Sequence, residues 1–211
     1  MKTAFFFLSA IAVLLFASVL ACNALPGIPL CPAVSSNALV LGSGAIHLFL
    51  ISTALLFLLD PDLKAMFKKL GFPGGLLNTL LYTVGGLVAV FAALFIISFA
   101  LFMLGVNDQG KVVDKISGLP VYILLFAVFF APFSEELFFR GFLVPRIGII
   151  GSAALFAVSH ITYGSIAEIA GVLTVGLILG AVFKYSKSIT PCILIHLIYN
   201  GISIAAIKLI T

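Results

Sequence analysis

The chain has 211 residues, of which 63% are hydrophobic and only 9% are charged. Soluble domains contain about 45–50% apolar and roughly 25% charged residues, so this composition excludes an ordinary soluble protein and predicts one that crosses a membrane several times. The net charge of +4 is small, and the sequence has neither a phosphate-binding loop nor a dinucleotide fingerprint. No basic patch suggests a nucleic-acid partner.

The first 22 residues begin with Lys2 and continue as an apolar run to Cys22. The run is long enough to span a bilayer, and its positive start also fits a signal peptide or signal anchor. We favour a retained first helix over a cleaved signal. Cys22 and Cys31 flank the proline-containing loop that follows, where an oxidising compartment would allow a disulfide between them.

Six further apolar segments predict transmembrane helices, at about 37–59, 76–105, 120–144, 147–162, 166–186 and 189–210. The stretch 107–119 between two of them is polar and predicts a loop. The fold class is therefore all-α, a polytopic bundle of about seven helices. Residues 1–118 supply three spans and residues 119–211 supply four, and together they form one membrane domain.

The fifth predicted span is unusually short, with about 16 residues where a full crossing needs about 20. One explanation is that this helix locally thins the bilayer. The other is that the turn at Pro145 lies buried in the membrane, which is tolerated only against protein or a wet cavity. Both explanations predict a polar hollow near the fourth and fifth helices.

Positive charges indicate the orientation, because lysine and arginine collect in cytoplasmic loops. With the N-terminus inside, the inner side carries Lys2, Lys64, Lys68, Lys69, Arg146, Lys184 and Lys187. The outer side then carries Lys111, Lys115 and Lys208. This bias predicts a cytoplasmic N-terminus.

The fourth predicted helix contains two adjacent carboxylates and a guanidinium within an apolar run, at Glu135, Glu136 and Arg140. Ionisable residues are rare in spanning helices and usually mark function or a partnered network. Glu136 and Arg140 are one turn apart and can pair, whereas Glu135 points about 100° away around the helix. One acid can therefore be held by the arginine while the other is left for chemistry.

Two more pairs share the same four-residue spacing, Phe156 with His160 and His196 with Asn200. If these helices converge on Glu135, a carboxylate and two imidazoles can activate water, by general base action or on a metal. The asparagine amide could stabilise an oxyanion. No HExxH motif occurs, and the candidates for a zinc site are Glu135, His160 and His196.

Each signal also has a structural interpretation. A single glutamate–arginine pair can hold helices together, a lone histidine is more often packed, and a His–Asn pair can bond two helices. His47 and Asn78 lie outside the three patterns, and we predict that they are structural. We predict that Glu168 stabilises the start of the sixth span through the helix dipole. The joint occurrence of the three patterns favours a site.

Together, Glu135-Glu136-x-x-x-Arg140-Gly141, Phe156-x-x-x-His160 and His196-x-x-x-Asn200 resemble the three signature motifs of the CAAX protease and bacteriocin-processing (CPBP, or Abi) family. That family contains the type II CAAX prenyl endopeptidase. The motifs occur in the same order on three separate predicted helices, and the likeness covers about residues 119–211. The resemblance implies an intramembrane endopeptidase with a helical core that encloses the motif residues.

The resemblance also implies roles for the motif residues. Glu135 would activate the attacking water, with His160 helping to hold it, and His196 and Asn200 would complete the water site and the oxyanion pocket. The remaining motif residues would support the site: Glu136, Arg140 and Phe156. We favour a mechanism without a metal because the ligands form no compact set, and zinc is the alternative.

Three classes of function follow. The leading one is a peptidase that cuts a membrane-associated peptide or protein in the bilayer. The second is a non-catalytic scaffold or bacteriocin-immunity factor that binds a membrane partner through the same pocket. The third is a small-solute transporter, for which the expected inverted repeats are absent from the sequence. The short chain is most similar to prokaryotic relatives, so we expect a multi-pass protein of a prokaryotic cell membrane.

Overall fold

The computed structural model describes residues 36–58, 63–72 and 75–211. Within these residues every regular element is a helix, so the all-α prediction is confirmed. The first predicted span and the Cys22–Cys31 pair lie outside the described residues.

The N-terminal part contains α2 (Ser36–Leu58), α3 (Leu63–Lys69), α4 (Leu76–Met103) and α5 (Gly110–Ser117). The predicted bounds of α2 and α4 as helices are confirmed to within two residues at each end. The prediction of a loop at 107–119 is wrong, because Gly110–Ser117 within it form the helix α5. Its partly buried Val112, Val113 and Ile116 recur at helical spacing between exposed charged residues, which is typical of a short amphipathic helix lying on the bundle.

The C-terminal part begins with an unbroken helical run made of α6 (Val121–Leu125), η1 (Phe126–Phe130), α7 (Ala131–Glu136) and η2 (Leu137–Leu143). It continues with α8 (Val144–Ser159), η3 (Ile161–Tyr163), α9 (Ile166–Ser186) and α10 (Thr190–Ile210). The segments η1 and η2 are π-helical. Such segments widen a helix locally and occur often at functional sites.

The reversal between the fourth and fifth predicted spans occurs at Gly148, which has a positive φ of 75°. Glycine adopts this conformation without a steric penalty. Pro145, Arg146 and Gly148 are exposed, so the turn is not packed inside the protein, and its depth in the membrane stays a prediction. The fifth helix is short because the fourth continues past Pro145 before the chain turns.

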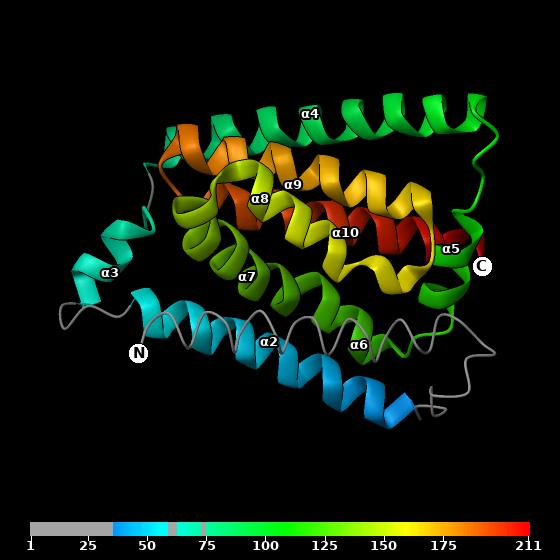
Figure 1. Cartoon of the computed structure of the whole chain (residues 1–211), viewed down its shortest axis with the longest axis horizontal. Coiled ribbons are helices and arrows are strands. Elements are labelled where there is room, and N and C mark those ends of the chain that lie inside the picture. Colours follow the sequence, from blue (N-terminus) through cyan, green and yellow to red (C-terminus); the bar gives the residue numbers. More distant parts are fainter. Residues whose placement is uncertain (1–35, 59–62, 73–74) are drawn as a thin grey trace.

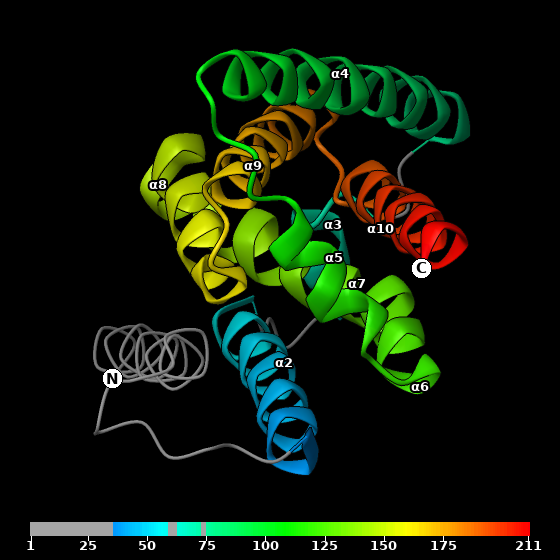
Figure 2. The same ribbon diagram turned by 90° about the vertical axis from the view of Figure 1, so that its right-hand side faces the viewer.

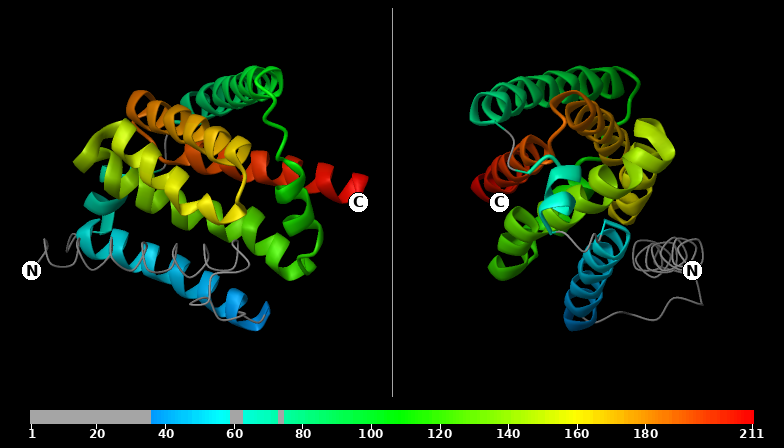
Figure 3. Two further views of the ribbon diagram at one scale, coloured as in Figure 1. Left: turned by 45° about the vertical axis from the view of Figure 1, so that its right-hand side comes forward. Right: turned by 90° about the vertical axis from the view of Figure 1, so that its left-hand side faces the viewer.

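The long helices run side by side along one direction (Figure 1). The end view shows α4 outside α9 and α10, with α2 on the opposite side of α6 and α7 (Figure 2). Two further views show α3 at one end and α5 at the other (Figure 3). We call the end with α3 the basic end; it also carries the Gly148 turn and the α9–α10 connection. We call the opposite end the α5 end.

Within the part of the chain that the structure describes, four runs are long and apolar enough to cross a membrane: Leu76–Met103, Val121–Tyr163, Ile166–Ser186 and Thr190–Ile210. The second of them doubles back at Gly148. On α4, large apolar side chains such as Val84, Val88 and Phe95 are exposed, as expected for a surface that faces lipid rather than water. The protein is an integral membrane protein.

Two glycines one turn apart allow α8 and α9 to approach closely. A Cβ atom at Gly176 would lie 3.0 Å from the Cβ of Ala153, and one at Gly180 would lie 2.7 Å from Ile149. Small residues at this spacing are a common basis for close helix packing in membranes. The contact brings the backbone of α9 against the middle of η2, where Arg140 lies.

Candidate active site

A buried ion pair lies where α7 continues into η2. The Nη1 atom of Arg140 donates to Oε1 of Glu136 over 2.7 Å, and both side chains are at most 1% exposed. The guanidinium also lies over the ring of Phe156, 4.5 Å from its centroid, and contacts the Gly176 carbonyl at 3.5 Å. Glu136 and Arg140 therefore pair across one turn, as their spacing predicts.

His196 from α10 joins this pair. Its Nδ1 lies 2.8 Å from Oε1 of Glu136, which as a carboxylate oxygen accepts, so Nδ1 carries a proton. Its Nε2 points the other way, 3.7 Å from Oε2 of Glu135. Glu136 thus fixes the ring orientation of His196 and leaves Nε2 facing the second acid, much as a carboxylate orients a catalytic imidazole.

Glu135 differs from its neighbour. Among the described residues its carboxylate has no hydrogen bond, and the Nε2 atoms of His196 and His47 lie 3.7 Å and 3.9 Å from its oxygens. These distances exceed a direct hydrogen bond. The side chain is 15% exposed, whereas that of Glu136 is fully buried. Neither oxygen of Glu135 is therefore occupied by a hydrogen bond from the described residues.

His47 on α2 is the site residue that the sequence analysis missed. Its Nδ1 lies 2.6 Å from the hydroxyl of Ser134, and that hydroxyl donates its one proton to the Ala131 carbonyl over 2.9 Å. Ser134 must therefore accept from Nδ1–H of His47, which leaves Nε2 of His47 facing Glu135. The signal was present, because an ionisable residue inside a spanning helix favours a functional interpretation. The sequence analysis did not predict this contact with Glu135.

Phe156 links the second motif to the first and third. Its ring centroid is 4.8 Å from that of His160 and 5.8 Å from that of His196, both edge to face. His160 ends α8, where its Nδ1 lies 3.0 Å from the Phe156 carbonyl and its ring stacks on Tyr163. The structure therefore brings the three motifs together around one aromatic ring.

Asn200 lies one turn beyond His196 on α10. Its Nδ2 donates to the carbonyl of Ala127 in the π-helical segment η1 over 3.0 Å. An amide nitrogen carries two hydrogens, so one donor of Asn200 remains after this bond. The asparagine fixes η1 against α10 and keeps one N–H donor on the face of α10 that carries His196.

The donor types needed for zinc are present, as imidazole nitrogens and a carboxylate. However, among the residues that the structure describes, no three His, Cys, Asp or Glu side chains are grouped so that they could hold a metal ion. The arrangement of Glu135, His160 and His196 does not fit a shared metal.

A second polar cluster, which we call the Asp108 clamp, joins the α5 end to the start of α9. Asp108 accepts hydrogen bonds from the Ser165 hydroxyl and from the backbone N–H groups of Ile166 and Ala167, at 2.9, 2.6 and 3.2 Å. Partial burial by itself would raise the pKa of Asp108, but these bonds hold the pKa below its ordinary value. From α5, Lys111 and Lys115 donate to the carbonyls of Gly164 and Thr162, the loop that follows His160.

Two other predictions outside the motifs also concern polar contacts. Asn78 donates to the carbonyl of Ser186 over 3.0 Å and ties α4 to the end of α9, a structural contact as predicted. Glu168 lies in the first turn of α9, where its N–H bonds the hydroxyl of Ser165. An acid at this position suits the helix dipole.

Residues 117–202 match the protein family described as Type II CAAX prenyl endopeptidase Rce1-like. The family resemblance is confirmed. The matched region contains all three motifs, begins just before α6 and ends two residues beyond Asn200. It excludes α2, and with it His47. No curated protein and no solved structure matches the chain.

At the level of the family, the match supports a CAAX-type intramembrane endopeptidase that works in a lipid bilayer on a protein substrate. The division at residue 118 into an N-terminal part and a catalytic core stays a prediction.

Proposed function

We propose that this protein hydrolyses a peptide bond in a membrane-associated peptide or protein, with water activated by Glu135. The observation that carries the proposal is the contrast between the adjacent acids. Glu136 is held by Arg140 and His196, whereas Glu135 has no hydrogen bond within the described residues and has an imidazole nitrogen near each oxygen. A free carboxylate in this setting suits a general base.

In this mechanism a water molecule lies beside Glu135. As its oxygen attacks the carbonyl carbon of the scissile bond, one of its protons passes to the carboxylate, and the carbonyl oxygen becomes an oxyanion. The protonated Glu135 then gives that proton to the departing amine nitrogen as the C–N bond breaks. The carboxylate is restored, and water has been divided between the two products.

The imidazoles would position this water. With Nδ1 protonated in both rings, the Nε2 atoms of His196 and His47 are acceptors, so a water that gives one hydrogen to Glu135 can donate its other hydrogen to one of them. By the family motif, His160 also helps to hold the water, and the remaining amide hydrogen of Asn200 would donate to the oxyanion. Each proposed role then uses an atom that is not already engaged in a structural hydrogen bond.

The supporting residues act through other residues of the site. Arg140 compensates the buried charge of Glu136, Glu136 orients His196, and Phe156 separates the rings of His196 and His160. Because the described side chains form no metal-holding group, we route no step through zinc and propose a glutamate-dependent reaction.

For orientation, we propose that the basic end faces the cytoplasm of a prokaryotic cell. Among the described residues, this end carries Lys64, Lys68, Lys69, Arg146, Lys184 and Lys187. The α5 end carries Lys111, Lys115 and Lys208. The excess at the basic end supports this orientation.

The test is cleavage of a membrane-peptide library, with and without prenyl groups, by the purified full chain. Wild type is compared with Glu135→Gln, Glu135→Ala and the matched control Glu168→Gln, which changes a glutamate outside the motifs. We expect cleavage by wild type and the control, a loss of about 10²–10⁴-fold in both Glu135 variants, and no effect of a chelator. A Glu135→Gln variant that cleaves like wild type would contradict the proposal and favour the scaffold function.

A further inference from the structure

A pocket of about 580 Å³ opens at the basic end, between α3, the Gly148 turn and the end of α9. Its volume lies within the range of small-ligand sites. Four lysines line it, Lys68 and Lys69 from α3 and Lys184 and Lys187 from the end of α9. None of its lining residues belongs to the three motifs, and no acidic residue is among the described residues that line it.

The two sides of this pocket are fixed to each other by backbone contacts. The N–H of Ile189 donates to the carbonyl of Leu70 over 3.0 Å, and Leu70 is buried. Next to it, Gly71 has a φ of 69°, and a Cβ atom there would collide with the carbonyl oxygen of Lys187. Lys187 itself has a positive φ of 57°, where it ends α9. A non-glycine residue in this conformation is uncommon and is held by its surroundings.

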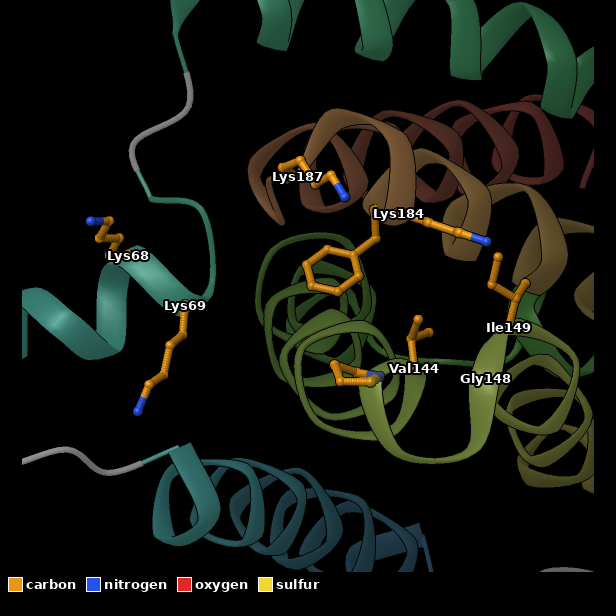
Figure 4. Close-up of a pocket in the computed structure, with 9 residues that line it drawn as sticks. Lys68, Lys69, Val144, Gly148, Ile149, Lys184 and Lys187 are labelled. Atoms are coloured by element: carbon orange, nitrogen blue, oxygen red, sulfur yellow. The ribbon is translucent and has the colours of Figure 1, made fainter.

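The lysines differ in where they point (Figure 4). Lys184 extends over Val144 toward Ile149 and Lys187 lies beside it at the end of α9, whereas Lys68 and Lys69 point away from this space, Lys69 toward the end of α2. The first pair is therefore placed to contact a ligand in the pocket, and the second pair raises the positive potential at its opening.

We propose that this pocket binds the phosphate headgroup of an anionic phospholipid. The cations supply the attraction for a phosphodiester, and basic pockets between membrane helices are typical sites for such headgroups. The rest of the lining includes apolar side chains, among them Val144, Ile149 and Phe183. Exposed Ile150, next to the pocket on α8, continues this apolar surface along the bundle, where an acyl chain would lie.

The location distinguishes a lipid from a soluble anion. The pocket lies at the end of helices that are long and apolar enough to cross a membrane, so a bilayer around these helices would place its phosphates near this end. A lipid would contact both the lysines and the apolar wall, whereas inorganic phosphate would contact only the lysines. This inference does not depend on the proposed peptidase activity.

The test measures retention of phosphatidylglycerol and phosphatidylcholine by the detergent-purified full chain, using native mass spectrometry. Lys184→Gln/Lys187→Gln is compared with Lys111→Gln/Lys208→Gln, which removes the same charge from the α5 end. We expect wild type and the control to retain phosphatidylglycerol over phosphatidylcholine. The pocket variant should bind phosphatidylglycerol roughly thirtyfold more weakly, because each lysine near a headgroup contributes about fivefold.

Lys184→Arg/Lys187→Arg should restore retention, because arginine keeps the charge. Equal phosphatidylglycerol retention by wild type and the glutamine pocket variant would overturn the proposal. So would an equal loss in the pocket and control variants, since that would show only a general effect of net charge. Displacement of the lipid by an equal concentration of inorganic phosphate would overturn the lipid assignment and identify a phosphate site.

Discussion

The motif cluster around Glu135 and the Asp108 clamp at the α5 end are both polar and both join segments distant in sequence, but they differ in how completely their groups are paired. Both carboxylate oxygens of Asp108 accept hydrogen bonds from the protein. Within the described residues of the motif cluster, Glu135 accepts no hydrogen bond, and neither the buried Oε2 of Glu136 nor Nε of Arg140 has a partner.

This difference in pairing distinguishes a structural polar cluster from a catalytic one. A buried polar group without a partner costs free energy, so a fold that needs only stability would pair it or replace it with an apolar residue. The Asp108 clamp satisfies its groups and holds the start of α9. The motif cluster keeps unpaired groups together in an apolar interior, which is the arrangement expected where a substrate or water completes the bonding.

The largest effect should follow from breaking the buried ion pair. Arg140→Met would leave the charge of Glu136 uncompensated, and we expect it to lower the free energy of unfolding by about 3–5 kcal/mol. Thermal or detergent-induced unfolding would measure this, with exposed Lys68→Met as a control expected to change stability by less than about 0.5 kcal/mol. The double variant Glu136→Gln/Arg140→Met should recover part of the loss. A single Arg140→Met variant as stable as wild type would show that the pair is not an essential part of the cluster.

A smaller effect, on rate rather than stability, should follow at His47. An asparagine amide can replace the Nδ1–H donor to Ser134 but not Nε2, so His47→Asn should keep the fold and lower kcat about 10- to 100-fold with little change in KM. His47→Gln, which reaches the Nε2 position, should lose less activity. Equal activity of His47→Asn and wild type would return His47 to the structural role predicted from the sequence.

The smallest effect should be at the Asp108 clamp. Asp108→Asn removes the charge and some of the accepted bonds at the start of α9, and we expect a loss of about 1 kcal/mol at pH 7 without a change in kcat. The pKa of Asp108 is lowered in the folded protein, so its contribution is complete above the ordinary value of 3.8 and is lost as pH falls through the folded value. The stability difference between wild type and variant should therefore shrink below pH 3.8. A difference that grows on acidification would contradict this assignment.

The sequence predicted the long helices well because each is a continuous apolar run bounded by polar or glycine-containing turns. The stripes Glu136/Arg140 and His196/Asn200 followed from helical periodicity. Periodicity does not reveal how one helix is rotated against another, so it gave neither the bond between His196 and Glu136 nor the approach of α2 to Glu135. The α5 helix was missed because its apolar face is short, and the Gly148 turn because Pro145 was taken as the end of the helix.

The central claim is that Glu135, which has no hydrogen bond within the described residues, is catalytic, whereas the fully hydrogen-bonded Asp108 is structural. One assay tests this claim most directly. Wild type, Glu135→Gln and Asp108→Asn would be reconstituted in liposomes, and initial rates of cleavage of one membrane-anchored peptide substrate from the library would be compared. We predict that Asp108→Asn cleaves at the wild-type rate and that Glu135→Gln, equally well folded, does not cleave. Cleavage by Glu135→Gln at the wild-type rate would contradict the account.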